Sequence, residues 1–239
     1  MKRYIFCLAR VFSKEQYALD FLSKGKFRCN TLRFFKDYKE EELNNIGDVN
    51  EGILFNMTRD SGAKLKVRPQ GTEEWMELDF QHLRYHSNSV LTNNVFCMYA
   101  PNLGVDEKYS VEEIEQIVKI QEEAEKLGEY LVLIIKPEIF FKRLQMEVVH
   151  KRKYLLRRGL IEYVNLQNSF NLNLDNPGFY KSDEYAHQKE YRIMIDDGKN
   201  EDLHMDLEIG SLDDIAFMIP TGDFNSSIKV SSKEELTEE

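Results

Sequence analysis

The longest apolar stretches of this chain are only strand-sized, and residues 130–135 (YLVLII) are the clearest of them. A membrane-spanning helix needs about 20 consecutive apolar residues, so no segment predicts a membrane span. A short run of branched and aromatic residues is instead typical of a buried central strand. The basic start of the chain has no signal-peptide cleavage site and is predicted to be a first strand. We therefore expect a soluble protein that makes no use of a membrane.

Cysteine usage indicates the compartment. Cys7, Cys29 and Cys97 are odd in number, lie in apolar runs and have no Cys-x-x-Cys spacing. Reduced, buried thiols are the simplest interpretation of this pattern. We expect a cytoplasmic protein.

Helix signals alternate with strand signals along the chain. Capping-box patterns at residues 13–16 (SKEQ) and 110–113 (SVEE) predict helices that end at Gly25 and Gly128, and Pro137 predicts the first turn of another helix. Short alternating runs predict strands, and those between residues 53 and 100 are predicted to form an antiparallel meander.

These elements predict an α+β fold, with a mixed, mostly antiparallel sheet and flanking helices. A chain of 239 residues can bury one sizeable core. We expect a single domain over residues 1–220, followed by a polar, partly flexible C-terminal tail over residues 221–239. Residues 36–52 are acidic and too long for a simple connection, which predicts a mobile loop or lid. Asp48 and Glu51 in this loop could close over a ligand or bind a cation, and the alternative is a solvated loop.

The late segment 188–192 (QKEYR) is the leading candidate for a functional site. If it is a strand, alternation places Gln188, Glu190 and Arg192 on one face. A carboxylate beside an amide can hold a ribose hydroxyl and stabilise a developing oxocarbenium ion. The alternative is a structural ion pair of Glu190 with Arg192 or Lys181.

Three segments resemble an uncharacterised bacterial and phage family. They are residues 25–35, residues 47–52, and Lys181 together with residues 188–192. Members of that family pair an early strand and an N-D-x-x-E loop with a late E-x-E-x-R strand. The late motif also resembles the Gln/Glu-x-Glu signature of ADP-ribosyltransferases. This second resemblance implies a protein that uses NAD, in which Glu190 contacts the nicotinamide ribose and Gln188 orients the acceptor.

The transferase resemblance further implies an early Arg or His on a first strand and a Ser, Thr or Tyr on a second. Arg10 and Thr31 are the available matches, although the Ser-Thr-Ser strand typical of that fold is absent. We therefore expect Glu190 and Gln188 as catalytic residues, and Arg10, Asn30, Thr31 and Arg192 around NAD. His82 and His86 could meet as metal ligands on a helix, but on a strand they would lie roughly 13 Å apart, too far to chelate one ion. No third ligand is evident, so no metal site is predicted.

A basic run at residues 150–158 is the second candidate site. Its cations can grip phosphates of a nucleotide or a nucleic acid, with Tyr154 available to stack on a base. They are Lys151, Arg152, Lys153, Arg157 and Arg158. The alternative is that they pair with carboxylates of the predicted helix over residues 110–126. The net charge of −10 argues against a protein that coats nucleic acid.

Three functions therefore remain open from the sequence. The leading hypothesis is an NAD-using, ADP-ribosyltransferase-like protein of phage or bacterial origin. The second is a non-catalytic module that binds a nucleotide or a protein partner in phage defence or counter-defence. The third is a nucleic-acid-binding protein. A Walker loop, a Gly-x-Gly-x-x-Gly run and a Gly-x-Ser-x-Gly elbow are absent from the sequence.

Overall fold

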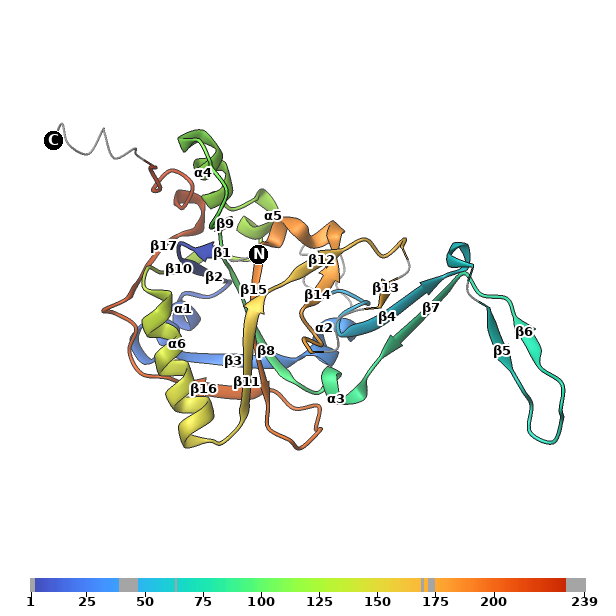
Figure 1. The fold of residues 1–239 in the computed structure, drawn as a ribbon. Coiled ribbons are helices and arrows are strands. Elements are labelled where there is room, and N and C mark those ends of the chain that lie inside the picture. Colours follow the sequence, from blue (N-terminus) through green and yellow to red (C-terminus); the bar gives the residue numbers. More distant parts are fainter. Residues whose placement is uncertain (1–2, 39–46, 63, 169, 172–174, 231–239) are drawn as a thin grey trace.

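An eight-stranded sheet lies at the centre of the molecule (Figure 1). The computed structural model describes residues 3–38, 47–62, 64–168, 170–171 and 175–230. The main path of the sheet runs β11-β15-β8-β2-β10-β17, while β3 pairs with β8 and carries β16. Its pairings are antiparallel, which confirms the predicted α+β fold with a mostly antiparallel sheet. The strands are β2 (Leu8–Phe12), β3 (Lys26–Thr31), β8 (Asn94–Tyr99), β10 (Tyr130–Ile134), β11 (Leu155–Leu160), β15 (Glu190–Asp196), β16 (Met205–Glu208) and β17 (Ala216–Pro220).

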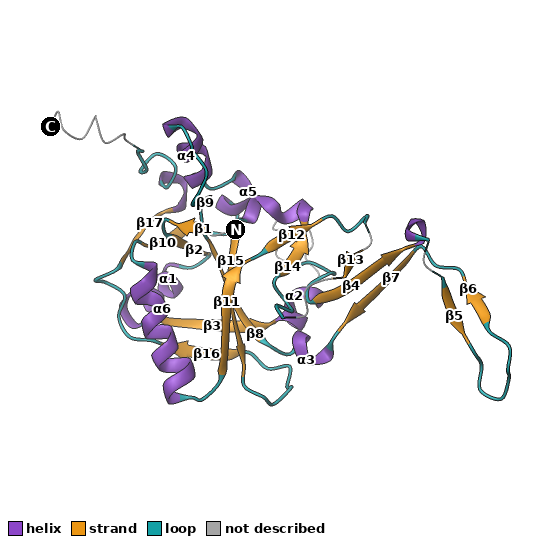
Figure 2. Cartoon of the chain, viewed as in Figure 1, coloured by secondary structure: helices purple, strands orange, loops and turns teal. Residues whose placement is uncertain are grey.

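Helices flank this sheet (Figure 2). They are α1 (Glu15–Lys24), α2 (Leu32–Asp37), α3 (Asn88–Leu91), α4 (Val111–Val118), α5 (Glu122–Glu125) and α6 (Pro137–Gln145). A π-helical turn, Met146–Lys151, continues α6, and 3-10 turns cover Arg59–Ser61, Asp183–Gln188 and Thr221–Asp223. The predicted proline start of α6 is confirmed.

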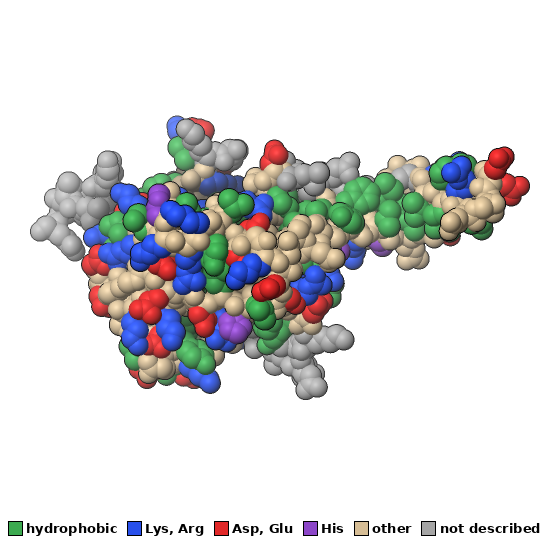
Figure 3. Space-filling view, turned by 90° about the horizontal axis from the view of Figure 1, so that it is seen from below, with side chains coloured by type: hydrophobic (Ala, Val, Ile, Leu, Met, Phe, Trp, Pro, Cys, Tyr) green, Lys and Arg blue, Asp and Glu red, His purple; other side chains and the backbone are tan. Residues whose placement is uncertain are grey.

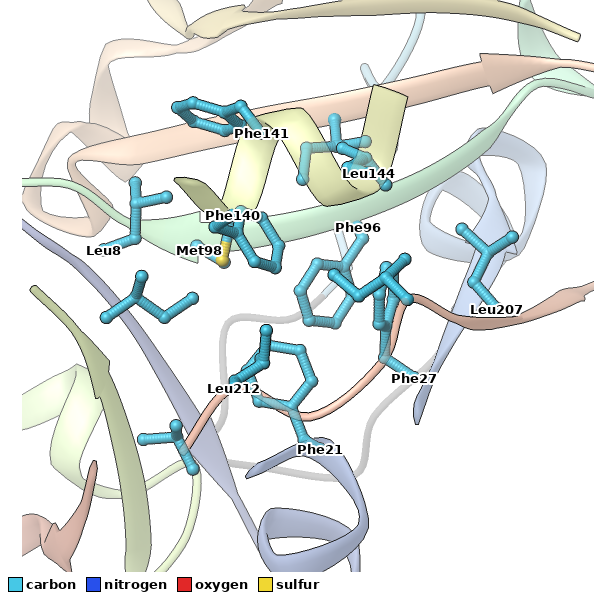
Figure 4. Packing of buried hydrophobic residues seen from close by; sticks show 14 of the residues in the cluster. Leu8, Phe21, Phe27, Phe96, Met98, Phe140, Phe141, Leu144, Leu207 and Leu212 are labelled. Atoms are coloured by element: carbon cyan, nitrogen blue, oxygen red, sulfur yellow. The ribbon is translucent and has the colours of Figure 1, made fainter. Parts of the chain in front are cut away.

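The main hydrophobic core lies between the sheet and helices α1 and α6. Phe21 of α1 and Phe140 of α6 are fully buried, and their ring centroids lie 6.3 Å apart. The ring centroids of Phe96 of β8 and Phe27 of β3 lie 4.4 Å apart (Figure 4). These aromatic contacts fix α1 and α6 on the same face of the sheet. Tyr191, Ile193 and Ile195 of β15 belong to this core, so alternation along the strand turns Glu190 and Arg192 to the opposite face.

Two helix predictions are wrong in detail. Residues 13–16 do not form a capping box, because α1 begins at Glu15 and Lys14 precedes it without a capping side chain. The helix predicted from residue 110 to Gly128 is interrupted at residues 119–121, between α4 and α5. Backbone groups at this break bond to side chains elsewhere in the fold, which offsets the lost helical hydrogen bonds. The capping box at Ser110 is confirmed.

The predicted first strand is two strands, β1 (Arg3–Ile5) and β2, and β1 pairs with β9 (Asn102–Gly104). Residues 160–164 are likewise divided between two strands. The first part ends β11, and the second part is β12 (Glu162–Val164), which lies parallel to β14 (Tyr180–Ser182). Both breaks allow the chain to leave one sheet and join another.

The predicted meander over residues 53–100 is wrong. Strands β4 (Ile53–Thr58) and β7 (His82–His86) pair with each other, with β13 (Phe170–Asn171) beside β4, and β5 (Leu65–Val67) pairs with β6 (Met76–Leu78). Strand β8 instead joins the central sheet, where it pairs with β2, β3 and β15 from distant parts of the chain. Figure 1 shows these ribbons as an arm that leaves the body on one side.

The hairpin β5–β6 is amphipathic and lies at the end of the arm. Leu65 pairs with Leu78 and Val67 with Met76, so these four side chains share one face. Met76 remains 55% exposed, and Figure 3 shows hydrophobic side chains along the arm. The apolar face of this hairpin therefore contributes little to the core of the body.

The first residues of the expected C-terminal tail are packed against the body. Phe224 is fully buried beside Leu131 and Ile120, and Thr221 donates its backbone N–H to the carbonyl of Glu129. Residues 231–239 of that tail lie outside the described residues. Within the described part of the chain, no helix combines the length and the apolar character needed to cross a bilayer.

Candidate functional site

The candidate site lies where β2 and β8 separate. The two strands share one register pair, Ala9 with Tyr99, and β8 then continues along β3. Beyond that pair, Nη1 of Arg10 donates a hydrogen bond of 2.6 Å to the carbonyl of Cys97. The guanidinium thus satisfies a strand carbonyl that faces the gap. A cavity of about 340 Å³ is found beside this gap.

The cavity combines apolar walls with a charged end. Apolar and aromatic side chains from several elements line it, including Phe12, Tyr17, Phe35, Ile120, Leu127 and Leu131. Polar groups also line it, namely Arg10, Glu51, Lys181, Gln188, Glu190 and Arg192. Pockets for small ligands have volumes of about 300–1,000 Å³ and combine these two kinds of surface. The cavity has the size and chemistry of a site for a small molecule or for one end of a larger one.

Four buried charges form a closed network at this end. Nε of Arg192 lies 2.7 Å from Glu190 Oε1, and its two terminal nitrogens reach the carboxylate of Glu51 at 2.8 and 2.9 Å. Nζ of Lys181 lies 3.5 Å from one oxygen of each carboxylate. All four side chains are 6% exposed or less. Two cations therefore neutralise two carboxylates inside the protein.

The network keeps Glu190 ionised. Burial by itself raises the pKa of this carboxyl, but the charges of Arg192 and Lys181 and hydrogen bonds from Cys97 and Arg192 lower the pKa to about 2. The pKa of Arg192 is raised, because the attraction of Glu190 and Glu51 outweighs burial. Glu190 is therefore a carboxylate at neutral pH, and a weak base. The predicted alternative, an ion pair of Glu190 with Arg192 or Lys181, is confirmed, because Glu190 contacts both cations.

Gln188 reaches the site by a different route from the one predicted. It ends the 3-10 turn Asp183–Gln188, and β15 begins only at Glu190, so the shared strand face is wrong for Gln188. Lys189 between them adopts a left-handed backbone with φ of 40°. Gln188 still lines the cavity, because Lys181 Nζ donates to its Oε1 at 2.8 Å.

Arg10 carries the least satisfied polar group of the cavity. Its Nε is buried and has no hydrogen-bond partner in the described part of the chain. The guanidinium lies 5.0 Å from the ring centroid of Phe96. Burial lowers the pKa of Arg10, and the negative charge of Glu190 opposes this shift. This buried donor without a partner carries a cost in folding free energy.

Asn30 and Thr31 are not among the residues that line this cavity. Thr31 caps α2 by accepting a hydrogen bond of 3.1 Å from the N–H of Phe34, and it donates to Asp202. Asn30 pairs with Val95 in the sheet. The structure therefore brings Arg10, Gln188, Glu190 and Arg192 together and leaves these two predicted residues outside the group.

Sequence reasoning missed the contributions of β8 and β12. Cys97 and Tyr99 line the cavity from β8, which lies between the strands of Arg10 and Glu190. Burial raises the pKa of the Cys97 thiol to about 12, so it is not a thiolate nucleophile. Tyr163 of β12 accepts a hydrogen bond of 2.9 Å from the N–H of Glu190. In the sequence, Cys97 and Tyr99 look like ordinary buried residues of an apolar strand, so no pattern marks them as part of a site.

The acidic loop supplies buried groups to the site. Asp48 and Glu51 are 2% and 1% exposed, so the solvated-loop alternative is wrong for both. Burial raises the pKa of Asp48, and its Oδ2 has no partner within the described residues. Residues 39–46, the middle of the predicted mobile loop, lie outside the described residues. No group of three or more metal-ligating side chains is found in the described part of the chain.

The basic run does not form one patch. Lys151 and Arg152 both pair with Glu147, at 2.9 and 3.0 Å, so the predicted alternative of pairing with the 110–126 segment names the wrong partner. Lys153 is exposed, with a left-handed φ of 64°. Arg157 and Arg158 are neighbours on β11, and alternation sends their side chains to opposite faces.

Comparison with known proteins finds no family model, no curated protein and no solved structure that matches this chain significantly.

Proposed function

We propose that this protein uses NAD in an ADP-ribosyltransferase-like reaction at the cavity between β2 and β8. One observation carries the proposal. Arg10 of β2, Glu190 of β15 and Gln188 line the same cavity, although they lie far apart in the sequence. These are three of the residues that the resemblance to ADP-ribosyltransferases assigns to the site. The resemblance also assigns a Ser, Thr or Tyr on a second strand, and in this proposal Tyr99 of β8 takes that role, because Tyr99 lines the cavity and Thr31 does not.

The cavity suits one nucleoside part of NAD. Phe12, Tyr17 and Phe35 supply aromatic surface for a flat ring. Arg10 lines the cavity with a half-buried guanidinium, suited to a phosphate or an amide oxygen of the ligand. At about 340 Å³ the cavity takes a part of the dinucleotide, and the remainder extends out of it.

Glu190 is suited to stabilise positive charge on a ribose. In the proposed reaction the bond between C1′ of the ribose and the nicotinamide nitrogen breaks, and its electron pair leaves with nicotinamide. An acceptor oxygen or nitrogen then bonds to C1′ and loses its proton to solvent. A carboxylate held ionised in a water-poor site stabilises the oxocarbenium-like transition state between these steps. Arg192 and Lys181 orient that carboxylate, and Lys181 orients Gln188 toward the acceptor.

The test is release of nicotinamide from NAD by the purified protein. Glu190→Gln preserves the shape of the side chain, and we expect a loss of turnover by at least about 100-fold, as for removal of one electrostatic contact to a transition state. Gln188→Ala tests the acceptor side, and we expect hydrolysis of NAD to survive while transfer to an acceptor falls. Thr31→Ala is the matched control, because Thr31 lies outside the cavity lining. Undetectable turnover by the unaltered protein, or equal turnover by Glu190→Gln, would contradict the proposal.

A non-catalytic nucleotide-binding module is the second candidate. The observation that favours it is that both oxygens of Glu190 already interact with Arg192 and Lys181 inside the protein. Such a carboxylate can be purely structural. Calorimetry with NAD separates the two functions. Binding without nicotinamide release supports the module, and binding with release supports the transferase.

A further inference from the structure

A second cavity, of about 270 Å³, lies beside β11. Arg157 and Gly159 line it from the strand, and Asn176 and Phe179 line it from the segment that leads into β14. Tyr180 lines this cavity, whereas Lys181, the next residue, lines the first one. The second cavity is therefore a separate site.

Arg157 differs from Lys151, Arg152 and Arg158 in having no ionic, hydrogen-bonding or aromatic side-chain partner among the described residues. Lys151 and Arg152 pair with Glu147. The Arg158 guanidinium lies 4.0 Å from the ring centroid of Phe141, and its Nη1 donates to the hydroxyl of Tyr191 at 3.3 Å. The half-buried Arg157 makes no ion pair or side-chain hydrogen bond with any residue of the described part.

The register of β11 and β15 leaves open space beside Arg157. Arg157 pairs with Met194 and Gly159 pairs with Arg192, so positions 157 and 159 share one face. A Cβ atom at position 159 would lie 3.8 Å from the ring of Phe179, in ordinary contact. The missing side chain of Gly159 therefore keeps this part of the cavity empty.

A half-buried guanidinium favours an anion. It has lost part of its hydration, and no carboxylate of the described residues pairs with it to compensate for this loss. Glu162 also lines the cavity and is exposed, so the two arginines leave the lining positively charged. The planar fork of an arginine matches two oxygens of a phosphate group.

We propose that the cavity around Arg157 binds a phosphate group. The phosphate belongs to a free nucleotide or to a nucleic-acid backbone, since both present the same oxygens to the guanidinium. The site does not depend on turnover of NAD in the first cavity.

The test is a titration of the full chain with inorganic phosphate, AMP and a ten-nucleotide oligothymidylate, followed by NMR chemical shifts. We expect shifts at Arg157 and Gly159. We also expect Arg157→Gln to weaken binding on the order of ten- to a hundredfold, as for loss of a charge-assisted hydrogen bond. Gly159→Val retains every charge but fills the space beside Phe179, and it should weaken binding to a similar extent. Lys151→Gln is the control, and it should bind within about threefold of the unaltered protein, because Lys151 lies outside the cavity lining and pairs with Glu147.

Each outcome decides the proposal. Affinity that is equal for AMP and the oligonucleotide supports a nucleotide ligand. Affinity that rises with oligonucleotide length and falls steeply with salt supports a nucleic-acid backbone. An equal loss in Arg157→Gln and Lys151→Gln would show general charge attraction and overturn the site, as would the absence of phosphate binding at low salt. Unimpaired binding by Gly159→Val would also overturn it.

Discussion

Among the described residues, a cluster of ion pairs inside the body around Arg192 contrasts with one on the surface around Glu147. In the first, four charged side chains are 6% exposed or less. In the second, Lys151 is 69% exposed and Arg152 33% exposed. The distances are similar, with the shortest contacts at 2.7 and 2.9 Å. The difference in surroundings therefore decides what each cluster does.

Because the inner cluster is buried, it stabilises the fold only when all of its partners are present. A complete network repays much of the cost of removing its charges from water, whereas a network with one partner missing leaves an uncompensated charge in a medium of low dielectric. The outer cluster remains solvated when one member is lost. The inner cluster can therefore hold Glu190 in one place and one protonation state, and the outer cluster mainly adjusts the surface potential.

Removal of one cation from each cluster should show the largest contrast. We expect Arg192→Met to lower the free energy of unfolding by about 3–5 kcal/mol, because Glu51 and Glu190 lose their main partner. The matched change Arg152→Met should cost less than about 1 kcal/mol. Urea unfolding followed by circular dichroism measures both. Equal costs would show that burial does not separate the clusters.

Acid should weaken the inner cluster within a defined pH range. The pKa of Glu190 is lowered from its ordinary value of 4.5 to about 2, so the folded state binds fewer protons than the unfolded state between these values. Its stabilisation is complete above pH 4.5 and is lost as the pH falls through 2. The loss should be on the order of 3 kcal/mol. Unfolding curves between pH 6 and 2 measure it, and the same fall in Glu190→Gln would assign the loss to other groups.

Coupling energies should differ between the two clusters. A double-mutant cycle of Glu51→Gln and Arg192→Met should give a coupling of about 2 kcal/mol, at the upper part of the range for residues in direct contact. The cycle of Glu147→Gln and Lys151→Met should give about 0.5 kcal/mol or less, as is usual for pairs four residues apart on a helix. Additive costs for Glu51 and Arg192 would contradict a closed network.

The salt dependence of the free energy of unfolding should show the smallest difference between the two clusters. Raising the ionic strength from 0.1 to 1 M should reduce the destabilisation by Glu147→Gln to near zero, from at most about 1 kcal/mol. The cost of Arg192→Met should remain, because mobile ions do not enter the interior. A salt-dependent cost for Arg192→Met would mean that the inner cluster is reached by solvent.

The sequence predicted the fold class because local signals were consistent. Pro137 marks the start of α6, Ser110 and Glu113 mark the start of α4, and residues 130–134 form a central strand. It failed where a partner comes from far away. No local pattern reveals that β8 leaves the meander for β15, or that Tyr99 and Lys189 bond to the break between α4 and α5.

The candidate site was predicted in part for the same reason. Glu190 and Arg192 are two residues apart on one strand, so alternation placed them together. The link from Glu51 to Arg192 spans most of the chain and arises from tertiary packing. Thr31 was assigned from the resemblance, but it caps α2 and lies outside the cavity lining.

The register of the arm has a consequence for how this chain can change. Thr58 and His82 are cross-strand partners, so the chain returns beside the point where it departed. The stretch between them leaves and rejoins the fold at the same place. It can therefore be lengthened, shortened or exchanged without a change in the path of the rest of the chain. The entropy of closing such a loop grows only slowly with its length. Selection can therefore rewrite the hairpin β5–β6 while the strands that carry Arg10 and Glu190 stay in place.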